Sequence, residues 1–279
     1  SAALDADRPQ VQYRIRGGDA LTRRFTVTTV PAPRVVAFRK AYRYPDYTQL
    51  PTKSVSESGG VLEGVEGTEV DLTLETDQPV AEAALRLDYG ERKDTRALAA
   101  KGASAVGGTL RLDRSGTYHV RLVARATGFE NTQSPVYEIR VTPDLVPAVE
   151  LETPTADRAV APDEVVALAG RARDDFGVAV LKQEYQVNRQ GWKVAQEWPS
   201  TQQEARASTS WDLLALGLKP GDELLVRYTA QDRRGSRGES TTRRLVVGPS
   251  GAQAGARAAV AAQQRVVAAL EQAAKAGQE

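Results

Sequence analysis

Apolar and polar residues alternate with a period of two in short runs along most of the chain. Residues 70–75 read V-D-L-T-L-E, and apolar residues occupy every second position of 83–87 and 118–124. Val165, Ala167 and Ala169 are expected to mark the apolar face of a further run. Such a period is typical of half-buried β-strands. The runs are short and lie roughly 8–12 residues apart, which indicates a β-sandwich rather than a parallel α/β sheet.

One larger pattern occurs three times, in residues 12–31, 118–143 and 224–249. In each copy a strand-like run leads into a polar turn that contains glycine, and a second strand-like run then ends at a proline. The pattern is typical of the last hairpin of a β-sandwich domain. Its repetition indicates a tandem array of domains. The sequence therefore predicts an all-β protein of tandem Ig-like or fibronectin III-like β-sandwiches.

The repeats divide the chain into four segments. Residues 34–143 and 146–248 are each long enough for a complete Ig-like sandwich of about seven strands. Residues 1–31 contain only the closing hairpin, so we expect them to be the terminal part of a truncated Ig-like domain. Residues 252–279 are rich in Ala, Gln, Arg and Glu, which favour helix, and we expect them to begin a helical or coiled-coil region.

Two turns carry structural signals. The sequence Asp113-Arg114-Ser115-Gly116 before Tyr118 is similar to the tyrosine corner of Ig-like sandwiches, in which the Tyr hydroxyl bonds to nearby backbone. Asp113, Gly116 and Tyr118 are therefore expected to hold this corner together. Pro220 and Gly221 occupy a turn similar to the equivalent one in fibronectin III domains.

Composition limits the chemistry that the chain can perform. The 37 basic and 36 acidic residues leave a net charge of +1, so there is no electrostatic case for a nucleic-acid partner. The absence of Cys excludes disulfides, thiolate metal sites and cysteine nucleophiles. A single His119, expected to point outward, excludes a multi-histidine metal site and weakens any histidine-based triad. We expect neither an enzyme nor a bound metal or cofactor.

Three tyrosines around Pro45 are the candidate binding residues. Tyr42, Tyr44 and Tyr47 could form an exposed aromatic platform for a glycan or a peptide. Alternatively, the rings pack at the edge of a domain or at the seam between domains, and we favour this interpretation. Burial of the rings separates the two hypotheses.

A pair of acidic residues is the candidate for metal binding. Asp174 and Asp175 could ligate calcium together with Asp232 or Glu184, since calcium prefers several carboxylates that converge on one loop. However, no motif with fixed ligand spacing is present. Acidic residues in β-turns commonly cap backbone amides, and we favour that role here.

The chain also resembles a known protein family. The resemblance lies in Y-x-Y-P-x-Y-T at 42–48, G-T-x-V-x-L at 67–72 and A-x-D-D-F-G at 172–177. These motifs are similar to those of an uncharacterised family of large, membrane-anchored bacterial proteins. Members carry tandem extracytoplasmic Ig-like domains followed by coiled-coil segments, and their genes often lie near those of MoxR-type ATPases and Bat-type aerotolerance proteins.

The resemblance implies an extracytoplasmic, membrane-tethered setting in the periplasm or cell envelope, but it transfers no functional residue. Our functional hypothesis is a non-enzymatic scaffold or interaction segment. It would contact protein partners or further copies of itself, in part through residues 252–279. The alternative is a glycan- or peptide-binding module that uses the three tyrosines.

Overall fold

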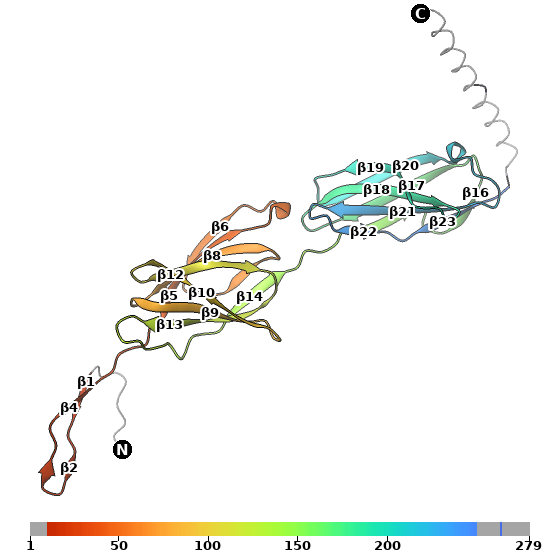
Figure 1. Ribbon diagram of the computed structural model, residues 1–279. Coiled ribbons are helices and arrows are strands. Elements are labelled where there is room, and N and C mark those ends of the chain that lie inside the picture. Colours follow the sequence, from red (N-terminus) through yellow and green to blue (C-terminus); the bar gives the residue numbers. More distant parts are fainter. Residues whose placement is uncertain (1–9, 250–262, 264–279) are drawn as a thin grey trace, which may run out of the picture. The chain divides into compact units, whose positions relative to one another are not determined.

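The computed structural model describes residues 10–249 together with Gln263 (Figure 1). It divides into two compact units, each of which is described by itself. The first comprises Ser1–Pro45 and Leu50–Pro143, and the second comprises Asp46–Gln49 and Asp144–Glu279. The segment expected to be helical, 252–279, lies outside the described residues apart from Gln263.

The chain begins with a two-stranded hairpin. Strands β1 (Gln10–Tyr13) and β4 (Phe25–Thr28) pair antiparallel, and β2 (Arg16–Gly17) pairs with β3 (Ala20–Leu21) near the tip. Tyr13 lies opposite Phe25, and their rings stack with centroids 5.4 Å apart. The hairpin strands pair only with each other among the described strands.

Residues 35–142 form a sandwich of two five-stranded sheets (Figure 1). The first sheet has the order β11-β12-β8-β5-β6. Its strands are β5 (Val35–Arg43), β6 (Lys53–Glu57), β8 (Thr68–Thr76), β11 (Ala99–Gly102) and β12 (Ala105–Leu112). A single 3-10 turn, η1 (Asp46–Thr48), lies between β5 and β6.

The second sheet of this sandwich has the order β10-β9-β13-β14-β7. Its strands are β7 (Leu62–Val65), β9 (Val80–Asp88), β10 (Lys93–Ala97), β13 (Gly116–Ala124) and β14 (Tyr137–Thr142). All neighbours are antiparallel except β14 and β7, which are parallel. Two mainly antiparallel sheets that pack face to face in this way define an Ig-like sandwich.

The core of this sandwich follows the period-two pattern. Side chains along β8 alternate between buried and half-buried, and Val70, Leu72 and Leu74 are fully buried. Leu85 and Leu87 on β9 face them from the other sheet as part of the same core cluster. The expected half-buried strands are therefore confirmed.

A second sandwich follows, with a three-stranded sheet of order β15-β17-β20 packed on a larger sheet of order β16-β23-β21-β18-β19. Strand β22 pairs with β21 outside this order, and β16 and β23 are parallel, as β7 and β14 are in the first sandwich. The strands are β15 (Ala148–Thr153), β16 (Arg158–Val160), β17 (Val165–Arg173), β18 (Val178–Val187), β19 (Lys193–Pro199), β20 (Glu204–Asp212), β21 (Glu223–Asp232), β22 (Arg237–Glu239) and β23 (Arg243–Val247). A 3-10 turn, η2 (Leu213–Leu216), connects β20 to β21.

The expected apolar face of β17 is wrong. Val166 and Leu168 are fully buried, whereas Val165 is 43% exposed. Five consecutive apolar residues, 165–169, leave the local pattern without a polar residue that could mark the outer face. Packing against the opposite sheet decides the matter, because Gly170 lies in the buried register and makes room for the ring of Tyr228.

We predict that Gly170→Ala destabilises the second unit by about 1–3 kcal/mol, the usual cost of overpacking a core. A Cβ atom at this position would lie 2.5 Å from two ring carbons of Tyr228, so the ring or the strand must move. All three tryptophans of the chain lie in this unit, so tryptophan fluorescence during urea denaturation reports its unfolding.

The matched control is Gly191→Ala, where a Cβ would meet no atom within 4 Å. Equal denaturation midpoints for the two variants would contradict the assigned packing.

Candidate functional site

The three candidate tyrosines do not form an exposed platform. Tyr42 is only 6% exposed and belongs to the core of the first sandwich, where it shares the inward face of β5 with Phe38. Tyr44 is half-buried against the same core and stacks on Tyr42, with ring centroids 6.3 Å apart. Tyr47 is half-buried on η1, a turn that is grouped with the second unit.

The environment of Tyr42 is that of a packing residue. Burial raises the pKa of its hydroxyl, and a hydrogen bond with the backbone of Glu63 partly offsets this effect. A ring that binds a sugar or a peptide must present its face to solvent. The burial of Tyr42 therefore favours the packing interpretation over the aromatic platform.

Tyr118 has a structural role, but with a different partner from the one expected. Its side chain is fully buried, and its hydroxyl donates a hydrogen bond to the carbonyl of Gly60, on the loop that precedes β7. Burial strongly raises the pKa of this hydroxyl. The predicted hydrogen bond to the turn 113–116 is wrong, because Tyr118 points between the sheets and not back along its own strand.

The other residues of the predicted corner have separate roles. Asp113 accepts a hydrogen bond from Nε of Arg111 at 2.8 Å. Gly116 lies tightly against the neighbouring strand, since a Cβ there would approach both the carbonyl oxygen of Asp88 and the ring of Tyr89 to 2.6 Å.

Pro220 and Gly221 form the centre of a β-turn. The amide of Asp222 donates to the carbonyl of Lys219 at 2.9 Å, and Gly221 has φ of +93°. Proline fixes the first central position of such a turn, and glycine tolerates the positive φ of the second. Oδ2 of Asp222 accepts a hydrogen bond from the amide of Lys219 at 2.7 Å, so a second hydrogen bond joins the first and last residues of the turn.

Two of the acidic residues proposed for calcium, Asp174 and Asp232, cap turns. Oδ2 of Asp174 accepts from the amides of Phe176 and Gly177, and Oδ1 of Asp232 accepts from the amide of Gly235 at 2.6 Å. The carboxylate of Glu184 accepts hydrogen bonds from Arg227, Thr229 and Arg237 instead. Among the described residues, no three acidic or histidine side chains are arranged to hold a metal ion.

An arginine that bridges two glutamates, here called the arginine clamp, recurs in both sandwiches and was not predicted from the sequence. Arg121 on β13 donates to Glu82 and Glu130, each at 2.9 Å. Arg227 on β21 occupies the equivalent place in the repeated hairpin, donating to Glu184 at 2.9 Å and to Glu239 at 2.8 Å. Each clamp ties a central strand to its neighbours.

Two further contacts extend this pattern. The guanidinium of Arg227 lies over the ring of Trp192, 3.9 Å from its centroid. In both hairpins a serine hydroxyl accepts a hydrogen bond from the amide of the central strand: Ser134 from Val120 at 2.9 Å, and Ser240 from Tyr228 at 3.0 Å. An alignment of the two hairpins would have shown the shared Arg and Ser positions in advance.

A buried lysine paired with an exposed glutamate holds the edge of the first sandwich. Lys40 is 1% exposed, and its ammonium group donates to Glu57 at 2.5 Å and to the carbonyl of Val61 at 2.7 Å. Lys40 lies on the same inward face of β5 as Phe38 and Tyr42. The period of two along this strand could therefore have predicted from the sequence that Lys40 is buried. A buried lysine needs such partners, because an unpaired charge in the core is costly.

Comparisons with known proteins add little to this description. No protein-family model and no curated protein matches the chain. The chain is similar to several solved structures at low identity. They include the fibronectin(III)-like modules of CbhA from Clostridium thermocellum, at 17% identity, with a TM-score of 0.28 and coverage of 68% of this chain and 90% of that one.

Two further similar structures are a domain of intimin and part of a bacterial adhesin. The D00-D0 domain of intimin is 11% identical, with a TM-score of 0.27 and coverage of 74% of this chain and 99% of that one. A 1.5-MDa bacterial ice-binding adhesin is 13% identical, with a TM-score of 0.35 and coverage of 65% and 58%. The assignment to tandem Ig-like sandwiches rests on the strand order and pairing described above. Within the described part of the chain, no helix has the length and apolar character of a membrane span.

We predict that Tyr118→Phe lowers the free energy of unfolding of the first unit by about 1 kcal/mol, the typical net value of one hydrogen bond. The carbonyl of Gly60 would lose its buried donor. Hydrogen exchange of peptides from β8 and β13 measures the loss, and Tyr13→Phe, in the exposed N-terminal hairpin, is the control. Unchanged protection would show that the hydroxyl contributes nothing.

We predict a pH dependence from the Lys40–Glu57 pair. The hydrogen bond and the charge of Lys40 lower the pKa of Glu57 below its usual value of 4.5. A lowered folded-state pKa means that the ionised carboxylate stabilises the fold at pH values above 4.5. This contribution is lost as the pH falls through the lowered pKa.

The stability of Glu57→Gln should therefore depend less on pH in the acidic range than that of the unmodified chain, as measured by circular dichroism from pH 6 to 2. The control is Glu91→Gln, whose carboxylate has no ion-pair partner among the described residues. Identical pH profiles for Glu57→Gln and the unmodified chain would contradict this assignment.

Proposed function

We propose that the chain is a non-enzymatic scaffold or interaction segment of a larger, membrane-anchored bacterial protein of the cell envelope. The observation that carries this proposal is the pair of successive Ig-like sandwiches, each with its own closed core and the same arginine clamp. The proposed domains are 34–143 and 146–248. Such modules space and present surfaces without performing chemistry.

The exposed faces of the sheets support a presenting role. Cross-strand ion pairs cover them, such as Arg173–Glu204 at 2.8 Å and Lys182–Glu197 at 2.8 Å. Individual surface pairs contribute little stability. Charged faces and edges do, however, prevent unwanted association between sheets. A tandem array at a cell surface requires this protection.

We also propose that residues 1–31 carry the closing hairpin of a further Ig-like domain. Val11, Tyr13, Phe25 and Val27 pair across β1 and β4 and form one apolar face, and Tyr13 is 45% exposed. An isolated hairpin is at best marginally stable in water. Further strands would bury this face as the equivalent faces of β14 and β23 are buried.

Protein partners or further copies of the chain are the proposed ligands, with residues 252–279 as one contact region. The glycan- or peptide-binding alternative has less support, because Tyr42 is buried and Tyr44 packs against the core. The extracytoplasmic, membrane-tethered location follows from the family resemblance.

To test this proposal, residues 34–248 are replaced by two unrelated β-sandwich domains of equal total length. The replacement is made within the complete protein and is studied in its own cell. A scaffold role predicts that envelope fractionation and the size of the detergent-extracted assembly stay unchanged. The comparison variant is Tyr44→Ala in the unmodified array, for which we expect no effect on the assembly. Loss of the assembly in Tyr44→Ala, with an unchanged denaturation midpoint, would overturn the proposal in favour of specific binding by the tyrosines.

A further inference from the structure

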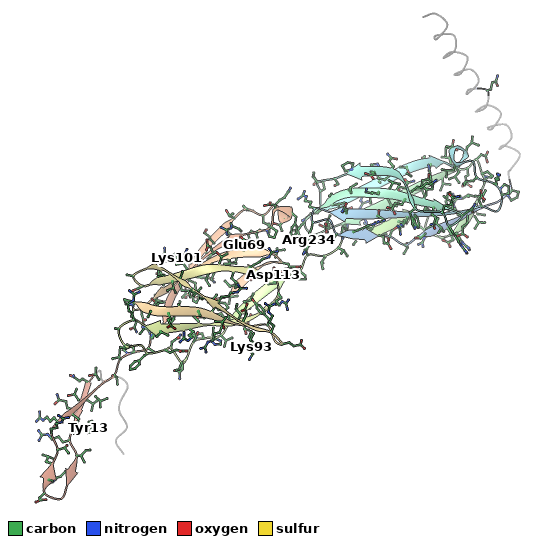
Figure 2. All side chains as sticks on the ribbon, in the orientation of Figure 1. Tyr13, Glu69, Lys93, Lys101, Asp113 and Arg234 are labelled. Atoms are coloured by element: carbon green, nitrogen blue, oxygen red, sulfur yellow. The ribbon has the colours of Figure 1, made fainter. Side chains whose placement is uncertain are left out.

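A cavity of about 250 Å³ opens at one end of the first sandwich, between the β9–β10 hairpin and the strand β12. Four arginines line it: Arg92, Arg96, Arg111 and Arg114. Tyr89 lies among them. Figure 2 marks this end of the sandwich by the labelled side chains of Glu69, Lys93 and Asp113.

The charges of this cavity do not cancel. Three carboxylates line it, and each has an arginine partner: Asp94 pairs with Arg96 at 3.3 Å, Asp113 with Arg111 at 2.8 Å, and Glu69 with Arg43 at 3.0 Å. Arg92 and Arg114 have no ion-pair partner among the described residues. Two guanidinium groups therefore remain uncompensated on the wall of one cavity, in a sandwich that pairs most of its other arginines.

Two turns fix the backbone positions of Arg92 and Arg114. The amide of Tyr89 donates to the carbonyl of Arg92 at 2.8 Å, and the amide of Gly90, with φ of +82°, donates to Asp88. This two-residue turn fixes the start of the Arg92 side chain. Arg114 lies in the short turn between β12 and β13, directly after the Asp113–Arg111 pair.

Tyr89 is fixed as well. Its ring lies so close to Gly116 that a Cβ atom there would approach the ring to 2.6 Å. Burial and the charges of Asp94 and Asp113 raise the pKa of Tyr89, and the charges of Arg96 and Arg114 lower it. The net shift is upward, so the phenol stays neutral at pH 7 and adds a hydrogen-bond donor to the lining of the cavity.

We propose that this cavity binds a phosphate group through Arg92, Arg114 and Tyr89. Each guanidinium offers a planar fork of N–H donors, a geometry that matches phosphate oxygens. A carboxylate has two oxygens and a single charge, which one arginine satisfies. A phosphate group carries more charge and more free oxygens, and so engages two arginines at once. The site is independent of the scaffold role.

The first experiment is calorimetric titration of the full chain with inorganic phosphate at low ionic strength. We expect weak, saturable binding by the unmodified chain. Arg92→Gln combined with Arg114→Gln should raise the dissociation constant at least about tenfold, since each removes a hydrogen bond to a charged group. Tyr89→Phe should raise it to a smaller extent.

The control is Arg189→Gln combined with Lys193→Gln, which removes the same net charge from the second unit. Equal weakening by both double variants would show only a response to overall charge and would overturn the site. Absence of saturable binding to the unmodified chain would also overturn it. Unchanged urea denaturation of each variant shows that the fold is intact.

A second experiment identifies the source of the phosphate group. Soluble polyphosphate is titrated into the chain, and separately the chain is sedimented with vesicles of phosphatidylglycerol or phosphatidylcholine. Binding of polyphosphate that depends on Arg92 and Arg114 assigns a soluble phosphate polymer. Sedimentation with phosphatidylglycerol alone, with the same dependence, assigns a lipid headgroup. Binding to both probes without that dependence would overturn the proposal.

Discussion

Burial of one apolar face from each of two sheets is the constraint on which the rest of this structure depends. A strand in which apolar and polar residues alternate has one apolar face to bury, and a second sheet can cover that face. Some large rings fit into this gap because a glycine leaves room for them. Gly170 on β17 leaves space for the ring of Tyr228 on the opposite sheet, and Gly60, on the loop before β7, leaves space for the ring of Tyr137 on the neighbouring strand β14. Substitution at such a glycine therefore affects the sheet packing and not only the local turn.

Two polar groups that enter this gap in the first sandwich are satisfied by partners distant in sequence. Lys40 reaches Glu57 and the carbonyl of Val61 at the edge of the first sandwich, and Tyr118 reaches the carbonyl of Gly60. Buried donors need partners, because desolvation without a hydrogen bond is costly. These contacts fasten the loop between β6 and β7 to the core, and so connect edge and centre within the first sandwich.

The outer faces follow a different rule. Solvent screens their charges, so cross-strand pairs regulate association more than stability. The arginine clamp repeats at Arg121 and Arg227, which indicates that the two sandwiches share one structural scheme. Against this background of paired charges, Arg92 and Arg114 lie on the wall of one cavity without an ion-pair partner among the described residues. A scaffold of stable modules leaves such a cavity available for a ligand.

The sequence by itself determined the features that depend on local pattern. Alternation predicted the strands β8, β9 and β13, the repeated hairpins predicted tandem sandwiches, and Pro220 with Gly221 predicted a turn. These features follow from side-chain period and from backbone preferences, which neighbouring residues settle. Only the tertiary structure decided which face of β17 is buried, because an all-apolar run has no polar residue to mark the outside. It likewise decided the partner of Tyr118, which lies 58 residues away, the burial of Tyr42, and the position of Arg92 and Arg114 on the wall of one cavity. Each of these depends on how strands distant in sequence pack together, and no local pattern encodes that arrangement.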